Sequence, residues 1–272
     1  MKKVAISVAP VYGKVTQLDP KKVAQDIIQC AKAGAGELHL HPRDRFGRLT
    51  DNLETFREIV DRVKSQVDIV VQVSPGASSQ LTMEQKCVPL RYPDVEMTSM
   101  NMTSMNFGRQ VRIVNPEDID YLSKEIIETN TIPEVELFDL GDFYTFKMID
   151  EIYKFPFKHL FNIGLGHEGR LPATPKALAA FLQFMPEDAV WNYTEIGRRD
   201  FKMITAAIGM GADGIRVGLE DSNYLDPTTQ VENNAPIVER IAKILQAMGT
   251  QPASPAEIRQ KLNIEKCVAV TR

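Results

Sequence analysis

The fold is decided by the stretch Val4-Ala5-Ile6-Ser7-Val8-Ala9-Pro10-Val11-Tyr12-Gly13-Lys14. It begins with a short apolar run that stops at Pro10, which is typical of a buried first strand rather than of a signal peptide. A doubly wound sheet usually carries a Gly-x-Gly-x-x-Gly turn after this strand, and the turn here lacks that spacing. The stretch therefore favours a closed (β/α)8 barrel over an open doubly wound sheet.

Strand-like runs recur along the chain about every 30 residues, which is the length of one βα unit. Helical patterns fill the intervals and include Pro20–Gly34, Leu53–Gln66 and Val231–Met248. This alternation predicts an α/β protein with a parallel sheet covered by helices, and eight units suit a (β/α)8 TIM barrel. The eight runs are Val4–Ala9, Glu37–His41, Ile69–Ser74, Val95–Met100, Glu134–Phe138, His159–Gly164, Ala189–Tyr193 and Gly214–Val217.

Helix-start signals lie between these runs. Asp19, Asn115 and Thr174 each precede a proline, so each is expected to cap a helix that begins at that proline. Ser254-Pro255-Ala256-Glu257 reads as a capping box for a last helix. Because no linker interrupts the chain, we expect one barrel domain over residues 1–272 with a C-terminal helical extension.

The composition is that of an ordinary globular protein, with 36 acidic and 32 basic side chains and a net charge of −4. A slightly acidic chain gives no electrostatic reason to bind nucleic acid. No apolar run reaches the roughly 18 residues of a membrane span. Cys30, Cys87 and Cys267 are odd in number and widely spaced, which indicates a reducing cytoplasm rather than a disulfide framework.

A candidate metal site lies at the end of the second run. His39 and His41 are two apart on a strand, so both imidazoles face the same side. The carboxyl ends of barrel strands carry the active site, and paired imidazoles suit zinc. Barrel closure brings the eighth run beside the first, so Glu220 or Asp221 can complete the site. The alternative is that these two acids cap the next helix and that Arg216 is only a structural ion-pair partner.

Other strand ends carry weaker signals. Ser74 precedes a Pro-Gly turn and can bond a substrate oxygen, while the uncharged, Met-rich segment 98–108 reads as a pocket-lining loop. Glu134 and Glu136 share one strand face, and a carboxylate inside a barrel is costly unless it is paired or used. His167-Glu168 lies in a glycine-rich loop for which a lid, a phosphate-binding loop and a second metal site all remain open.

Six motifs follow one another in order: His39-Leu40-His41-Pro42-Arg43-Asp44, Gln72-Val73-Ser74, Ser99-Met100-Asn101, Asn106-Phe107-Gly108, Pro133-Glu134-Val135-Glu136 and Arg216-Val217-Gly218-Leu219-Glu220-Asp221. This ordered set resembles the β-keto acid cleavage enzymes, whose founding activity is 3-keto-5-aminohexanoate cleavage in lysine fermentation. The resemblance implies a zinc-dependent (β/α)8 barrel that reacts a β-keto acid with acetyl-CoA, giving acetoacetate and a new acyl-CoA. It also implies a homotetramer.

The resemblance further implies roles for individual residues. His39, His41 and Glu220 correspond to the Zn2+ ligands. Asp221 corresponds to the catalytic base, and Arg216 is its partner in a dyad. Such a base removes the proton next to the ketone, and the resulting enolate attacks the acetyl group.

Substrate contacts are implied in the same way. Ser74, counted also as catalytic, and Ser99 correspond to residues that hold substrate oxygens, and Asn101 belongs to the same substrate-binding set. Glu136 matches a carboxylate that contacts the amino group of the aminated substrate.

Two departures from the family pattern leave the exact substrate open. The family's Ser-Thr-Gly-Gly turn is Ser74-Pro75-Gly76-Ala77 here, and Pro75 has no N–H to donate. A second glutamate near the end of the first strand has no counterpart in Tyr12-Gly13-Lys14-Val15. Two other functions remain as alternatives: a metal-dependent aldolase or hydrolase that uses no CoA, and a non-catalytic metabolite-binding barrel.

Overall fold

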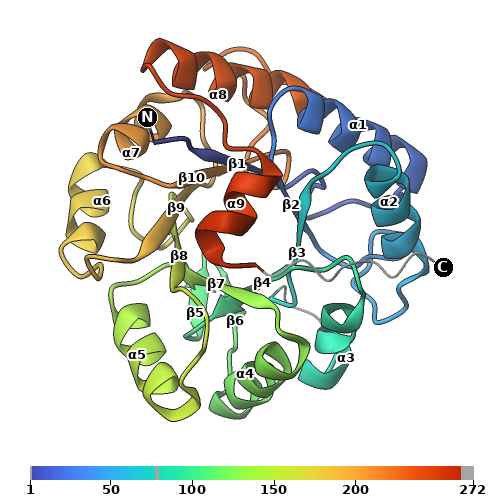
Figure 1. Cartoon of the computed structure of the whole chain (residues 1–272), viewed down its shortest axis with the longest axis vertical. Helices are drawn as coiled ribbons and strands as arrows, with labels where there is room; N and C mark the ends of the chain where they lie inside the picture. The colour runs from blue at the N-terminus through green and yellow to red at the C-terminus, as the bar shows by residue number, and fades with distance from the viewer. Residues whose placement is uncertain (1, 77–79, 265–272) are drawn as a thin grey trace.

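Eight parallel strands close into a barrel in the computed structural model, which describes residues 2–76 and 80–264 (Figure 1). Around the barrel the order is β1-β10-β9-β8-β7-β4-β3-β2, so β10 and β2 both flank β1. Each strand lies within or overlaps one of the eight predicted runs, which confirms the predicted (β/α)8 fold. The strands are β1 (Ala5–Val8), β2 (Glu37–Leu40), β3 (Val70–Val73), β4 (Met97–Asn101), β7 (Ile132–Leu137), β8 (Leu160–Leu165), β9 (Val190–Glu195) and β10 (Gly214–Val217).

Helices ring the barrel in Figure 1. An apolar core of side chains fills the space between the helices and the strands. The predicted helix Val231–Met248 begins later than expected, because residues 231–234 form the connection that leads into α8. The helices of the ring are α1 (Pro20–Lys32), α2 (Glu54–Lys64), α3 (Met83–Cys87), the short 3-10 helix η1 (Val88–Arg91), α4 (Pro116–Thr129), α5 (Gly141–Tyr153), α6 (Pro175–Leu182), α7 (Lys202–Gly209) and α8 (Ala235–Ala247).

Two of the three predicted N-caps form the expected hydrogen bond. Asp19 accepts from the backbone N–H of Lys21 at 3.0 Å, and Thr174 accepts from that of Ala177 at 3.2 Å. Asn115 precedes α4, but its side chain makes no capping bond to the backbone. Its amide donates to the Asp118 carboxylate at 3.0 Å instead. That capping prediction is wrong, because the side-chain oxygen of Asn115 accepts from none of the first backbone N–H groups of α4.

The last helix, α9 (Pro255–Leu262), closes the amino-terminal end of the barrel and lies across the middle of the ring in Figure 1. It begins with the predicted capping box, in which Ser254 and Glu257 exchange hydrogen bonds with each other's backbone. Ile258 and Leu262 pack against an apolar layer built from the first inward-facing residues of the strands. That layer contains Ala5, Val70, Met97, Ile132, Leu160 and Val190.

Arg259 ties α9 to the strands and is only 5% exposed. Its guanidinium donates to both oxygens of Asp68, at 2.8 and 2.9 Å, and also to Glu96. Bidentate hydrogen bonds between an arginine and a carboxylate are stronger than hydrogen bonds between neutral groups. Arg259 therefore anchors the helix that covers the base of the barrel.

We expect Arg259→Met to lower the free energy of unfolding by about 2 kcal/mol, because the charge-assisted bonds to Glu96 and Asp68 are lost together. Chemical denaturation measures the change. Arg62→Met is the matched control, since Arg62 makes an exposed pair with Glu58 on α2 and such pairs are worth roughly 0.5 kcal/mol or less. Equal effects of the two substitutions would contradict the anchoring role.

A polar layer fills the barrel above the apolar one. Glu134 accepts from Gln72 at 2.8 Å and from Asn192 at 2.6 Å, so both of its oxygens are engaged. Glu37 accepts from Ser7 at 2.9 Å. Burial, with the neighbouring charge of Glu136, raises the pKa of Glu134 to about 7. Every acid of this layer thus has a hydrogen-bond donor on a neighbouring strand.

A hairpin replaces part of the loop expected at 98–108. β4 extends to Asn101, and β5 (Met105–Phe107) then pairs antiparallel with β6 (Gln110–Arg112). The backbone N–H of Gly108 in the hairpin turn donates to Glu168 at 2.8 Å, which joins the hairpin to the loop after β8. The segment therefore has regular structure, and it still lines the mouth of the barrel, as expected.

Two expectations from composition concern the environment of the chain. Cys30 and Cys87 are buried free thiols, and burial raises the pKa of Cys87 to about 12. Cys267 lies outside the described residues. Within residues 2–76 and 80–264, no helix has both the length and the apolar character needed to cross a membrane.

Candidate active site

A cavity of about 710 Å³ opens at the carboxyl ends of the strands. This is the end at which (β/α)8 barrels carry their active sites. The cavity collects side chains from β2, β4, β7 and β10 and from the segment that follows β3, and nearly all of the residues singled out by the sequence line it. Those lining it are His39, His41, Ser74, Asn101, Glu136, Arg216, Glu220 and Asp221, and Ser99 lies directly behind Ser74.

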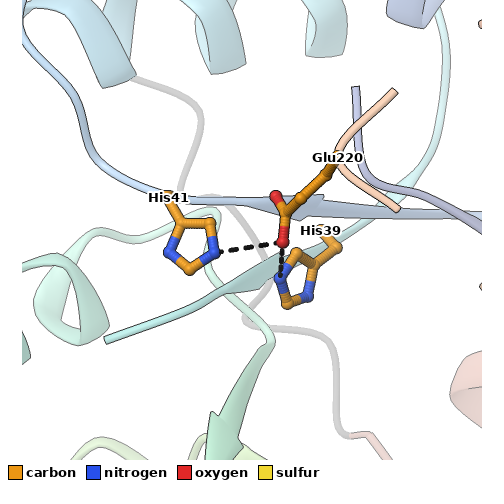
Figure 2. Close-up of side chains that lie close together, drawn as sticks. All are labelled: His39, His41 and Glu220. Atoms are coloured by element: carbon orange, nitrogen blue, oxygen red, sulfur yellow. Dashed lines mark hydrogen bonds and ion pairs between the residues drawn. The ribbon is translucent and has the colours of Figure 1, made fainter. Parts of the chain in front are cut away.

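His39, His41 and Glu220 converge on one point, as Figure 2 shows. Glu220 Oε1 lies 3.3 Å from His41 Nε2 and 3.7 Å from His39 Nε2. The other ring nitrogens have partners of their own: His41 Nδ1 bonds the Ser74 carbonyl at 3.0 Å, and His39 Nδ1 bonds the Gln72 side chain. Imidazoles held in this way, with Nε2 left facing a common point, are typical of metal ligands.

The protonation of this group suits a divalent ion. Burial and the charge of Arg216 lower the pKa of His39 to about 3, so its ring is neutral. Burial alone would raise the pKa of Glu220, but the charges of His41 and Arg216 hold it well below its usual range. Two histidines and a carboxylate, with ligand atoms within 4.8 Å of one another, fit the donor set of zinc.

A second set of three possible ligands, His39, Glu134 and Glu136, also lies within 4.8 Å. Both oxygens of Glu134 already accept amide N–H groups, so this set offers fewer free lone pairs. The donor chemistry therefore favours the group that contains His41 and Glu220.

The turn after β10 delivers Glu220 and Asp221 to the same site. Gly218 has a φ of +149°, and a Cβ there would lie 2.2 Å from the carbonyl oxygen of Ala9. The chain then turns, with the N–H of Ser222 donating to the carbonyl of Gly218 at 2.9 Å. Because this backbone is not extended, both acids reach Arg216, although only Glu220 meets the histidines.

Arg216 is the electrostatic centre of the site. It donates to Asp221 through two nitrogens, at 2.7 and 3.2 Å, to Glu220 at 3.0 Å and to Glu136 at 3.3 Å. Burial raises the pKa of Asp221, and the charge of Arg216 opposes that rise. Asp221 is thus a buried carboxylate beside the histidine group, held by a planar guanidinium and not shared with the imidazoles.

Three polar side chains lie at the carboxyl ends of β3 and β4, next to β2 in the barrel. Ser74 and Ser99 lie 2.6 Å apart through their hydroxyl oxygens. Asn101 is buried, and within the described part of the chain its Oδ1 has no hydrogen-bond partner. These side chains therefore offer hydroxyl and amide groups to a polar ligand. Ala77, the last residue of the Ser-Pro-Gly-Ala turn, lies outside the described residues.

Arg112, from β6, lines the cavity and escaped the sequence prediction. His167, for which the sequence left three roles open, also lines the cavity and packs against Phe107 and Phe138, with ring centroids 4.3 and 5.2 Å apart. Burial, with the charges of Arg216 and Arg112, lowers the pKa of His167 to about 4. Two short runs flanking Gly108-Arg109 are a hairpin signal that could have revealed Arg112. Within the described residues, His167 belongs to neither group of possible metal ligands.

The fold and the site define a (β/α)8 barrel enzyme with its polar cluster at the carboxyl ends of the strands. The chain matches the family described as beta-keto acid cleavage enzyme over residues 16–264, and it belongs to that family. It is 31% identical to the 3-keto-5-aminohexanoate cleavage enzyme of Acetoanaerobium sticklandii, covering 98% of this chain and all of that protein.

Two further proteins show how far the similarity extends. The 3,5-dioxohexanoate:acetyl-CoA acetone transferase of Paraburkholderia graminis is 26% identical, with 94% of this chain and 92% of that protein covered. The apo structure of ObcA superposes with a TM-score of 0.71 at 16% identity, covering 91% of this chain and 65% of that chain. At that identity, the likeness to ObcA shows the fold alone.

Proposed function

We propose that the chain transfers acyl groups between a β-keto acid and acetyl-CoA. The observation that carries this proposal is the buried Asp221–Arg216 pair beside the group formed by His39, His41 and Glu220, all lining one cavity. Membership of the family supports it, as does the name of the Paraburkholderia relative, which includes acetyl-CoA.

In the proposed reaction, the acetyl group of acetyl-CoA and the original acyl group of the β-keto acid change places. Removal of the proton between the ketone and the carboxylate gives an enolate, whose carbon attacks the acetyl carbonyl and releases CoA. CoA then attacks the original ketone, the bond between that carbonyl and the central carbon breaks, and the central carbon takes back the proton that was removed in the first step. The products are acetoacetate, built from the acetyl group and the carboxymethyl fragment, and the acyl-CoA of the remainder.

We propose that His39, His41 and Glu220 hold a zinc ion. When bound, zinc would stabilise the negative charge that develops on the keto acid as its proton leaves. The chain's own part is to present two imidazoles, from β2 and from the residue that follows it, and one carboxylate from the turn after β10. Gln72 and the Ser74 carbonyl fix the two rings through their Nδ1 atoms.

In this proposal Asp221 takes the proton and Arg216 is its orienting partner. The paired contacts from Arg216 fix the plane of the carboxylate, and burial raises its pKa toward the range useful for a general base. Ser74 lies at the cavity wall, where its hydroxyl can donate to the substrate carbonyl. Ser99, Asn101 and Glu136 complete the substrate-binding set.

The domain organisation, the oligomeric state and the location in the cell are proposed from the sequence. We propose one barrel domain in which α9 is a C-terminal helical extension, a homotetramer in solution and a cytoplasmic location. Light scattering coupled to gel filtration measures the assembly directly. A mass other than that of four chains would contradict the tetramer.

The test of the function is an assay with acetyl-CoA labelled in both acetyl carbons. Acyl transfer places the label in the ketone and methyl carbons of acetoacetate and generates a new acyl-CoA. A metal-dependent aldolase or hydrolase would consume the β-keto acid without acetyl-CoA and leave acetoacetate unlabelled. Tight keto acid binding without turnover, with zinc supplied, would instead indicate a metabolite-binding barrel.

A further inference from the structure

A second cavity, of about 220 Å³, adjoins the barrel mouth between α3, α4 and the β5–β6 hairpin. Gly76, Asn101 and Arg112 line both this cavity and the larger one. Much of the remaining lining is apolar, including Met83 and Leu122. A substrate that reacts at the barrel mouth can therefore extend its far end past Arg112 into this side cavity.

Arg112 brings to this junction a guanidinium that has no ion-pair partner among the described residues, although the charge of Glu136 acts on it. It is half-buried, and among the described residues its guanidinium makes no hydrogen bond or ion pair. Arg216, in the same large cavity, is by contrast paired with three carboxylates. A guanidinium withdrawn from water without a partner is costly. The guanidinium of Arg112 is therefore available to bind an anionic ligand.

The side cavity carries a second cation. Lys86 is half-buried and, within the described part of the chain, also makes no hydrogen bond or ion pair. Among the described residues that line this cavity, Asp118 is the one acid, and its carboxylate already accepts from Asn115 at 3.0 Å. Burial, and then the charge of Arg112, lowers the pKa of Lys86. The cavity thus has a positive excess that favours an anionic ligand.

Two donors lie side by side at the junction. A Cβ on Gly76 would lie 2.4 Å from Arg112 Nη2 and 2.5 Å from Asn101 Nδ2, so both nitrogens pack closely against this glycine. Neighbouring N–H donors match the two oxygens of a carboxylate. The buried Oδ1 of Asn101 has no partner among the described residues, so the amide is not committed to another group.

The charges disfavour an ammonium group at this place. Glu136 is the carboxylate that the family resemblance assigns to an amino group, yet it accepts from Arg216 at 3.3 Å and lies in the field of Arg112 as well. The second glutamate of the family pattern has no counterpart at Tyr12-Gly13-Lys14-Val15. An ammonium at the junction would face Arg112 and Lys86.

We propose that the preferred substrates are β-keto acids with a second carboxylate at the far end, and that Arg112 and Asn101 bind this carboxylate. Lys86 adds charge from the side cavity. This inference rests on the proposed acyl transfer and names the class of substrate for the same site. Gly76 allows the two donors to approach each other.

The test compares three β-keto acids of equal carbon number with a carboxylate, a methyl and an ammonium-bearing end: 3-oxoadipate, 3-oxohexanoate and 5-amino-3-oxohexanoate. With saturating acetyl-CoA, we expect the highest kcat/KM for 3-oxoadipate. Arg112→Gln should lower that value by about 10- to 100-fold, the usual range for a charged hydrogen bond, and change the value for 3-oxohexanoate less than about threefold.

Two further variants sharpen the result. Arg109→Gln is the matched control, because Arg109 is exposed in the turn of the same hairpin, and it should leave all three substrates unchanged. Gly76→Ala should reproduce the selective loss on 3-oxoadipate, because the added methyl displaces Arg112 and Asn101. Thermal melts of each variant establish that it is folded.

An equal loss on all three substrates, or a raised KM for acetyl-CoA, would overturn the proposal by assigning Arg112 to the shared part of the substrate or to CoA. Preference for the aminated substrate would overturn it too. Calorimetric binding of 3-oxoadipate without acetyl-CoA separates the two proposals. If Arg112→Gln abolishes that binding while no acetoacetate forms from any substrate, the dicarboxylate site stands and the acyl transfer fails.

Discussion

Asp221→Asn is expected to lower kcat by about 10²- to 10⁴-fold, which is the usual contribution of a general base. The zinc content is expected to stay at the wild-type level. A carboxamide keeps the shape of the side chain and can still accept from Arg216, which now donates to both Asp221 oxygens. It cannot take a proton from the substrate. Asp221 also lies outside the group of His39, His41 and Glu220, so the metal site should survive.

Three measurements on Asp221→Asn separate the possible outcomes: zinc stoichiometry, turnover, and exchange of the substrate's acidic proton in D2O. Asp226→Asn serves as the control, since Asp226 bonds only Thr228 and Thr229 within its own loop in the described structure. Proton exchange at the wild-type rate would eliminate Asp221 as the base. Loss of zinc would mean that Asp221, rather than Glu220, is the third ligand.

His41→Ala is expected to weaken zinc binding by well over 100-fold and to abolish acetoacetate formation. Loss of an outer-sphere partner alone costs about 10- to 100-fold, and a direct ligand costs more. The side chain of His41 is 10% exposed and lines the cavity, so its removal should leave the barrel folded. His39→Ala should have the same effect on zinc but should also cost stability, because His39 is buried and bonded to Gln72.

Metal analysis of the purified variants, with wild-type protein at equal zinc exposure, provides the measurement. His159→Ala is the control: His159 packs on Phe146 near Asp150, away from the cavity, and its loss should leave zinc content unchanged. Wild-type zinc content in His39→Ala or His41→Ala would remove the metal assignment.

Much of the barrel could be predicted from sequence because its strands are short, apolar and regularly spaced. The period of two in a strand places His39 and His41 on one face, and barrel closure places the turn after β10 near them. The proximity of Glu220 to both histidines therefore followed from topology. Which of Glu220 and Asp221 meets them did not, because that depends on the left-handed turn at Gly218.

The hydrogen-bond partners that side chains find on other strands of the barrel could not be predicted from the sequence. The sequence placed Glu134 and Glu136 on one face but could not distinguish their roles. The difference comes from Gln72 on β3 and Asn192 on β9, which engage both oxygens of Glu134 and leave Glu136 at the cavity wall. Arg112 was missed because each strand of its hairpin has only three residues, which is too short for a period of two to stand out; the Gly108-Arg109 turn was the local signal for it.

The hydrogen bonds of the polar layer have a direction, and that direction sets the tautomer of a proposed metal ligand. Both oxygens of Glu134 accept, so Gln72 must turn its NH2 toward Glu134 and its carbonyl toward His39. His39 then carries its proton on Nδ1, and the lone pair of its Nε2 accepts from Arg216 Nη1 at 3.3 Å, beside Glu220. Glu134→Gln would keep the volume but supply a donor, which permits residue 72 to flip and the proton to move to Nε2. A glutamate that does not line the cavity thus specifies, two side chains away, which ring nitrogen of His39 carries the lone pair.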